Sequence, residues 1–174
     1  MRFTLSSTAL CNKLVALSRV INSKNSLTIL SDFVFDVEDN LLKLTASDSE
    51  NTLHTTMSLT ESDSNGRFAI NNHNLLEAIK GISEQPITFD VNLSENLVKV
   101  NYQNGLFSLP IESADEYPAT QEVSAQSTSI TLTSSMLLDN IIRTIFATAQ
   151  DEIRPVMNGI YFDLTPDCLA IVAS

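Results

Sequence analysis

Hydrophobic positions near the start of the chain recur with two different periods. A period of two residues predicts strands, and a spacing of three or four residues predicts a helix. Alternation at Arg2–Ser6 predicts a strand. Leucines spaced three or four residues apart predict a helix over about Thr8–Asn22, with Ser7 as its N-cap. Three more alternating runs predict strands: Asp32–Val37, Leu41–Ser47 and Thr52–Leu59.

The same order of elements then recurs up to residue 112. A strand at Arg67–Ile70 precedes a helix at Asn72–Ile82, and Asn104-Gly105 predicts a type I′ hairpin turn. The strands that follow this second helix are Ile87–Leu93, Leu97–Tyr102 and Leu106–Glu112. The order βαβββ therefore occurs twice, which predicts an α+β domain with two helices packed on mainly antiparallel sheet.

A third start of this pattern follows a polar segment. Residues 113–128 contain Pro118 and show no period, so we predict a linker there. Beyond it, Phe3–Ser47 aligns with Ile130–Ser174 without a gap, each residue meeting the one 127 positions later. Identical residues, apolar substitutions and the predicted N-caps Ser7 and Ser134 coincide in this register. We interpret this as a true repeat, with domains 1–127 and 128–174, the second being the truncated start of a domain.

Composition narrows the class of protein. The apolar fraction of 43% suits a packed core. Ten basic residues against 21 acidic ones give a net charge of −11, which taken alone argues against a compact nucleic-acid-binding domain. Neither a signal peptide nor an apolar run of ~18 residues is found, so no membrane span is expected. Cys11 and Cys168 form no CxxC pair, and we predict a reducing cytoplasmic location.

Candidate catalytic chemistry is sparse. We interpret His54 and His73 as solvated surface residues, and Cys11 as a packed thiol. The four glycines can hardly build a phosphate-binding loop, and no metal-ligand spacing occurs. We therefore expect no catalytic residues, no metal and no cofactor. A hydrolytic or small-ligand α+β enzyme is a weaker alternative that would depend on the two histidines.

Several motifs resemble one known family. The run Asp151–Phe162, DEIRPVMNGIYF, resembles the second-domain signature of the bacterial DNA polymerase III beta subunit, the sliding clamps. Met1–Thr4, Leu27–Leu30 and Leu44–Asp48 resemble that family's first domain. The resemblance covers the whole chain and implies a DNA-clamp fold, with one full domain plus the start of a second.

The resemblance also implies a function. A family member has three such domains, and two protomers close into a ring whose helices face duplex DNA. Its expected role is that of a processivity factor, a non-catalytic subunit that tethers the replicative polymerase and is loaded by a clamp loader. A ring held by topology needs only a weakly basic lumen, which reconciles the role with the acidic composition. A fragment of this length is expected to stay monomeric. The alternative is a non-catalytic β-rich binding module unrelated to DNA.

Site residues follow from the same resemblance, position by position. The predicted DNA-facing residues are Lys13, Arg19, Lys24, Lys80 and Arg143. One side of the cleft that binds short hydrophobic motifs of polymerase and loader is predicted at Arg154, Pro155, Val156, Met157 and Ser174. Val156 and Met157 also match the core positions Ile29 and Leu30, so core packing remains an alternative for them. The dimer edge is predicted at Phe107 and Leu109, where core packing explains Phe107 equally well.

Overall fold

The computed structural model describes residues 1–174 except 23–26, 49, 120–123, 125 and 150–152. The chain forms two compact units, Met1–Gln121 and Glu122–Ser174. Among the described residues, no helix is long and apolar enough to cross a membrane.

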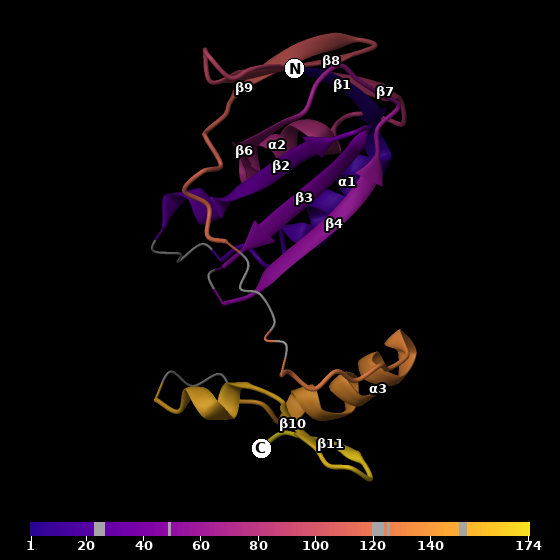
Figure 1. Ribbon diagram of the computed structural model, residues 1–174, viewed down its shortest axis with the longest axis vertical. Helices are drawn as coiled ribbons and strands as arrows, with labels where there is room; N and C mark the ends of the chain where they lie inside the picture. Colours follow the sequence, from indigo (N-terminus) through magenta and orange to yellow (C-terminus); the bar gives the residue numbers. More distant parts are fainter. Residues whose placement is uncertain (23–26, 49, 120–123, 125, 150–152) are drawn as a thin grey trace. The chain divides into compact units, whose positions relative to one another are not determined.

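The first unit contains two sheets and two helices (Figure 1). The elements, in order, are β1 (Arg2–Ser6), α1 (Ser7–Leu17), the 3-10 turn η1 (Thr28–Ser31), β2 (Asp32–Glu38), β3 (Leu41–Ser47), β4 (Thr52–Ser58), β5 (Glu61–Ser62), β6 (Gly66–Asn71), α2 (Asn72–Lys80), β7 (Pro86–Asn92), β8 (Leu97–Tyr102) and β9 (Gly105–Pro110). Every strand pairing is antiparallel. The predicted α+β architecture with a duplicated βαβββ order is therefore confirmed.

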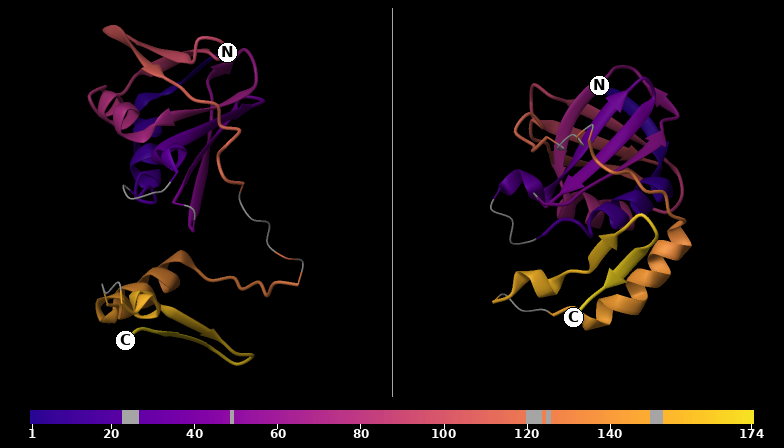
Figure 2. Two further views of the ribbon diagram at one scale, coloured as in Figure 1. Left: turned by 90° about the vertical axis from the view of Figure 1, so that its left-hand side faces the viewer. Right: turned by 60° about the horizontal axis from the view of Figure 1, so that its bottom comes forward.

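The two βαβββ halves exchange their first strands. One sheet has the order β5-β1-β7-β8-β9, and the other has the order β4-β3-β2-β6. Thus β1, which opens the first half, pairs with β7 of the second half, while β6, which opens the second half, pairs with β2 of the first. The four-stranded sheet and the helix α1 that crosses behind β3 and β4 are visible in Figures 1 and 2. This exchange joins the two halves into one compact unit.

Four phenylalanines mark the exchange at the centre of the core. Phe3 and Phe89 are cross-strand partners in one sheet, and their rings stack at 5.0 Å. Phe35 and Phe68 are the matching partners in the other sheet, at 5.3 Å. Phe3–Phe68 and Phe35–Phe89 contacts at 6.5 and 5.9 Å join the pairs. All four rings are fully buried, so they link the two sheets through aromatic packing.

Both helices end earlier than the sequence pattern predicts, and α1 also begins one residue earlier. The N-cap of α1 is Ser6, not Ser7, because the Ser6 hydroxyl accepts from the Ala9 amide while the Ser7 side chain is buried. The helix ends at Leu17 rather than Asn22, since Arg19 and Val20 donate to carbonyls only three residues back. Helix α2 likewise ends at Lys80.

The predicted type I′ turn at Asn104-Gly105 is wrong by one residue. Tyr102 pairs with Gly105, so the two-residue loop is Gln103-Asn104 and Gly105 already belongs to β9. None of these loop residues has a positive φ. The Gln85 side chain accepts from the Gln103 amide at 2.7 Å and helps to fix the turn from outside the hairpin. By contrast, the Asp39-Asn40 turn has φ values of 46° and 64°, as a type I′ turn requires.

The segment predicted as a linker begins later than residue 113. Glu112 exchanges two backbone hydrogen bonds with Ala69 of β6, at 2.8 and 2.9 Å. Ala114 and Tyr117 are buried and pack with Leu30 and Val34 in a second, smaller core. The chain therefore leaves the first unit only after Tyr117.

The second unit repeats the first in the predicted register. Its elements are α3 (Ser134–Thr144), the 3-10 turns η2 (Ile145–Ala147) and η3 (Pro155–Asn158), β10 (Tyr161–Leu164) and β11 (Leu169–Val172). Helix α3 matches α1, and η3 matches η1, residue for residue at 127 positions. The β10–β11 pairing, Phe162 with Ile171, repeats the pairing of Phe35 with Leu44. The repeat inferred from sequence is thus a structural repeat.

Two details of the second unit differ from the prediction. The cap of α3 is Thr133 rather than Ser134, which is the same one-residue offset as in α1. The residues that correspond to β1, 129–133, form no strand. In the first unit β1 is paired on both sides by β5 and β7, and the described residues of the second unit contain no counterpart of either. An extended segment without a hydrogen-bonding neighbour does not form sheet.

Candidate functional site

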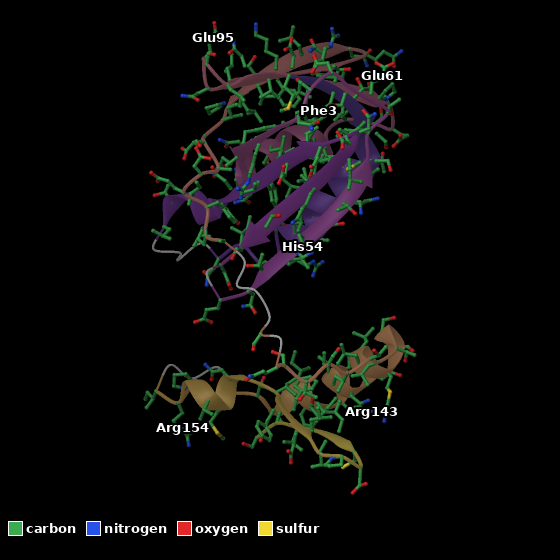
Figure 3. All side chains as sticks on the ribbon, in the orientation of Figure 1. Phe3, His54, Glu61, Glu95, Arg143 and Arg154 are labelled. Carbon is green, nitrogen blue, oxygen red and sulfur yellow. The ribbon has the colours of Figure 1, made fainter. Side chains whose placement is uncertain are left out.

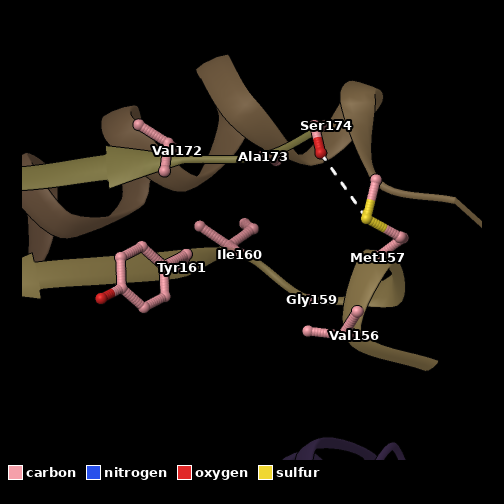
Figure 4. A pocket seen from close by; sticks show the side chains of 8 residues that line it. All are labelled: Val156, Met157, Gly159, Ile160, Tyr161, Val172, Ala173 and Ser174. Carbon is pink, nitrogen blue, oxygen red and sulfur yellow. Dashed lines mark hydrogen bonds between the residues drawn. The ribbon is translucent and has the colours of Figure 1, made fainter. Parts of the chain in front are cut away.

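An apolar groove lies within the second unit, between η3 and the β10–β11 hairpin (Figure 4). Its volume is about 380 Å³. Met157 and Ser174 close one end, where the Ser174 hydroxyl donates to the Met157 sulfur at 3.7 Å. The lining residues are Val156, Met157, Gly159, Ile160, Tyr161, Val172, Ala173 and Ser174.

Local chain chemistry positions this groove. Pro155 begins η3, where its fixed φ suits the first residue of a turn and its missing N–H costs nothing. The Met157 amide donates to the Arg154 carbonyl, and the Met157 carbonyl accepts from Ala149, both at 2.9 Å. These bonds hold Met157 half-buried, while Val156 is 86% exposed. The groove can therefore take an apolar side chain, because its surface is apolar and a thioether adapts its shape.

The structure brings together three of the five residues predicted for the partner cleft. Val156, Met157 and Ser174 line the groove. Arg154 precedes η3 and Pro155 is its first residue, and neither lines the groove; Arg154 is exposed (Figure 3). Sequence reasoning did not identify the remaining lining residues, which include Tyr161 and Val172. These two are cross-strand partners, and the repeat register would have placed them together.

The residues predicted to face DNA differ in their exposure and in their position relative to the helices. Arg19 and Lys80 are exposed, but Arg19 lies in the turn after α1 rather than on the helix. Lys13 is half-buried, and its ammonium donates to the Thr55 hydroxyl of β4 at 2.9 Å. Arg143 is exposed on α3 (Figure 3). Lys24 lies outside the described residues, so its predicted DNA contact stays a prediction.

The exposed face of α1 and α2 is polar rather than strongly basic. The two helices pack on the core through Leu10, Leu14, Leu75 and Ile79, which are fully buried. The side chains that remain exposed on them are Thr8, Asn12, Val15, Ala16, His73, Asn74, Glu77 and Lys80. Such a surface offers hydrogen bonds to a phosphate backbone but little net charge.

Phe107 and Leu109 occupy the edge strand β9 of the five-stranded sheet. Both are half-buried and pack against the main core, and the Phe107 ring lies 6.2 Å from that of Tyr102. Their neighbour Leu106 points the other way along the strand and is 63% exposed. The core-packing alternative therefore accounts for the side chains of Phe107 and Leu109. Among the described strands β9 pairs only with β8, so its other backbone edge is free to pair with a further strand.

Burial raises the pKa of two ionisable groups in the first unit well above their ordinary values. Burial, reinforced by the nearby carboxylate of Glu112, raises the pKa of Asp32 to about 6, and a hydrogen bond from the Asn71 amide at 3.3 Å opposes this. Burial also raises the pKa of Tyr117 to about 12. His54 and His73 are exposed, as the sequence predicts. Within the described part of the chain, no group of three or more His, Cys, Asp or Glu side chains could hold a metal ion.

Comparisons with known proteins agree with this architecture. Residues 1–122 match the family model described as DNA polymerase III beta subunit, N-terminal domain. The chain is similar to the beta sliding clamp of Vibrio cholerae serotype O1, with 26% identity over 174 residues, covering 100% of this chain and 47% of that protein. The chain spans about half the length of the curated relatives it matches.

Solved structures give the same picture. The DNA polymerase III subunit beta of Pseudomonas aeruginosa matches with a TM-score of 0.90 and 27% identity, over 100% of this chain and 47% of that one. A sliding clamp from the same organism, bound to griselimycin, matches with a TM-score of 0.91 and 26% identity, over the same shares. The family match, the duplicated fold and the repeat of α1 and η1 in α3 and η3 lead to one conclusion: this chain belongs to the DNA polymerase III beta subunit family.

Proposed function

We propose that the chain is part of a sliding clamp, a ring-shaped and non-catalytic processivity factor that encircles duplex DNA and tethers the replicative polymerase. Membership of the beta subunit family carries this proposal. The structural repeat supports it, because a ring is built from successive copies of one unit, and α3 begins a second copy in register.

The electrostatics suit a ring held by topology. With a net charge of −11 the chain would be repelled by DNA over most of its surface, and Arg19, Lys80 and Arg143 provide local positive charge near helices. Each phosphate neutralised contributes a slope of about −0.9 in log K against log salt. Because the lumen would carry so few basic groups, we expect it to bind DNA weakly and with little dependence on salt, which allows sliding rather than tight binding.

The groove in the second unit is proposed as the docking site for short hydrophobic motifs of the polymerase and the clamp loader. Its apolar lining and its open shape support this role. Val156, with 86% of its surface exposed, offers apolar area that a partner can cover.

The edge of β9 is proposed as the surface through which protomers join. An unprotected edge strand pairs readily with a strand of another domain, and Gly105–Pro110 carries no charged side chain that would discourage it. Phe107 and Leu109 would then stabilise the edge from its core side. We further propose a cytoplasmic location, and that the 174 residues by themselves remain monomeric.

Retention on DNA tests the clamp mechanism. The protein, expressed together with whatever coding sequence adjoins this chain, is loaded by a clamp loader onto nicked circular DNA, and half of each sample is then linearised. A topological ring stays on the circle and slides off the linear ends. Equal retention on the two forms would contradict the proposal, and so would retention on the circle that disappears with moderate salt.

A further inference from the structure

A short segment that follows β9 covers one face of the four-stranded sheet in the first unit. Along β2, Phe33 faces the main core, whereas Val34 packs on the opposite face against Tyr117. Successive side chains of a strand alternate between the two faces of a sheet, so Asp32 lies on the same face as Val34. Residues 112–117, which we call the strap, therefore lie over the face that carries Asp32.

The strap is attached to the sheet at its two ends. At one end Glu112 exchanges two backbone hydrogen bonds with Ala69 of β6, at 2.8 and 2.9 Å. Ala114 and Tyr117 are buried in the smaller core, and the two residues between them are exposed. Among the described residues, the bridge to Ala69 is the strap's only backbone pairing with a strand. A segment held by so few bonds can open locally while the rest of the unit stays folded.

Asp32 is the acidic group beneath the strap. It is 6% exposed, and its carboxylate accepts from the neutral amide of Asn71 on β6 at 3.3 Å. The described titratable groups that act on it both belong to the strap. The Glu112 carboxylate repels its negative charge, and the Tyr117 phenol lies near it and near the Ser47 backbone. Burial, reinforced by Glu112, raises the pKa of Asp32 to about 6.

Tyr117 anchors the strap imperfectly. Its ring is buried with Leu30 and Val34, but its hydroxyl is buried without a hydrogen bond of ordinary geometry to the described residues. A buried hydroxyl that lacks such a bond has lost its bonds to water without full replacement. Opening of the strap would return this hydroxyl to water, so the closed state is less stable than its apolar contacts alone imply.

We propose that the strap and Asp32 form a pH-sensitive device, in which the strap stays closed while Asp32 is protonated and opens more often when Asp32 is ionised. The reason is electrostatic. In the closed strap an ionised Asp32 is both shielded from water and repelled by Glu112. Opening admits water and carries the Glu112 charge away, so the open state holds the proton less tightly. Opening is therefore favoured as pH rises through about 6.

Opening would change the first unit in two ways. It would expose Leu30, Val34 and Ala69, which are at most 2% exposed beneath the closed strap. It would also free the chain from residue 112 onward, and this chain leads on to the second unit, which would then be held by a longer tether. This device goes beyond the proposed clamp function and requires neither a ring nor DNA.

Native-state hydrogen exchange of the 174-residue chain, followed by NMR at several low urea concentrations, tests the proposal. The amides of Ala69 and Glu112 report opening of the strap, and the amide of Val100 in the inner strand β8 reports unfolding of the core. The strap amides should be less protected than Val100 and should depend less on urea, because local opening exposes little surface. Equal protection and equal urea dependence at the three amides would show that the strap does not open by itself.

The pH dependence tests the role of Asp32. Between pH 5 and pH 7 the protection of the strap amides, corrected for intrinsic exchange, should fall by up to about tenfold, because Asp32 loses its proton near pH 6 when the strap is closed and near its ordinary pKa of 3.8 when it is open. In Asp32→Asn this fall should disappear. A fall below about twofold in the parent, or an unchanged fall in the variant, would overturn the proposal.

A second variant separates the Glu112 charge from the fold. Glu112→Gln keeps both backbone bonds to Ala69 and removes the repulsion, so the fall in protection should be smaller than in the parent. Glu116→Gln is the matched control, because Glu116 is an exposed carboxylate of the same strap that is not among the groups acting on Asp32. Equal effects of the two variants would contradict the proposal. If Asp32→Asn does not fold, this comparison decides, since both glutamates are exposed.

Discussion

Asp32 should make the first unit less stable as pH rises from 4 to 7. Asp32 lies at the start of β2 with 6% of the residue exposed, and its pKa in the folded state is about 6 against 3.8 ordinarily. The folded state therefore holds the proton more tightly than the unfolded state does. The stabilisation by the protonated form is fully present below about pH 3.8 and is lost as pH rises through 6.

The magnitude follows from the raised pKa. Each pKa unit corresponds to about 1.4 kcal/mol, so a rise from 3.8 to about 6 corresponds to at most about 3 kcal/mol. The opposing hydrogen bond from Asn71 is already part of this balance, and we expect about 1–3 kcal/mol. The substitution Asp32→Asn keeps the shape and a carbonyl that can accept from Asn71, but it removes the titration.

Urea denaturation at a series of pH values measures the effect. The free energy of unfolding of Asp32→Asn should equal that of the parent near pH 4 and exceed it by about 1–3 kcal/mol at pH 7. Subtracting the parent at each pH cancels the contributions of all other carboxylates. Asp90→Asn, at an exposed position on β7, is the matched control. A difference between variant and parent that does not change with pH would refute the reasoning.

Three further outcomes are expected. Phe35→Ala removes one of the four stacked core rings and should cost about 3–5 kcal/mol of unfolding free energy in urea denaturation, whereas a cost below about 1 kcal/mol would show that the core re-forms around the cavity. Ser6→Ala removes the cap of α1 and the hydroxyl that donates to Glu84, so it should cost about 0.5–2 kcal/mol by thermal denaturation; Ser6→Asn should restore much of this. Replacing Arg19 and Lys80 by Glu should lower residual duplex affinity of the 174-residue chain in low salt with the fold unchanged by circular dichroism, and unaltered affinity would exclude these residues from the DNA-facing surface.

The helices show how far local patterns reach. Leucine spacing identified the buried faces of α1 and α2 correctly, because a 3.6-residue period reports which side of a helix meets the core. It did not locate the helix ends, since Ser6 and Ser7 are equally good caps in isolation. Their roles separate only when Ser7 is buried and donates to the Ser83 carbonyl, 76 residues away.

The groove shows a different limit. The sequence resemblance selected Val156, Met157 and Ser174, and these residues do meet in one groove. It also included Arg154 and Pro155, which are neighbours of Val156 in sequence but do not line the groove. Contact across the hairpin, as between Tyr161 and Val172, depends on strand register rather than on adjacency.

The sequence alone determined the order of elements, the alternation that separates core from surface, and the repeat at 127 positions, because each of these is a property of residues near one another or of two segments compared directly. Only the tertiary structure decided that β1 and β6 exchange between the halves, that Gln103-Asn104 forms the turn, and that Tyr117 belongs to the first unit's core. The physical reason is the same in each case. A strand or a loop takes its place according to the hydrogen-bonding partner and the apolar contacts it finds far away in the chain, and local pattern carries no record of those partners.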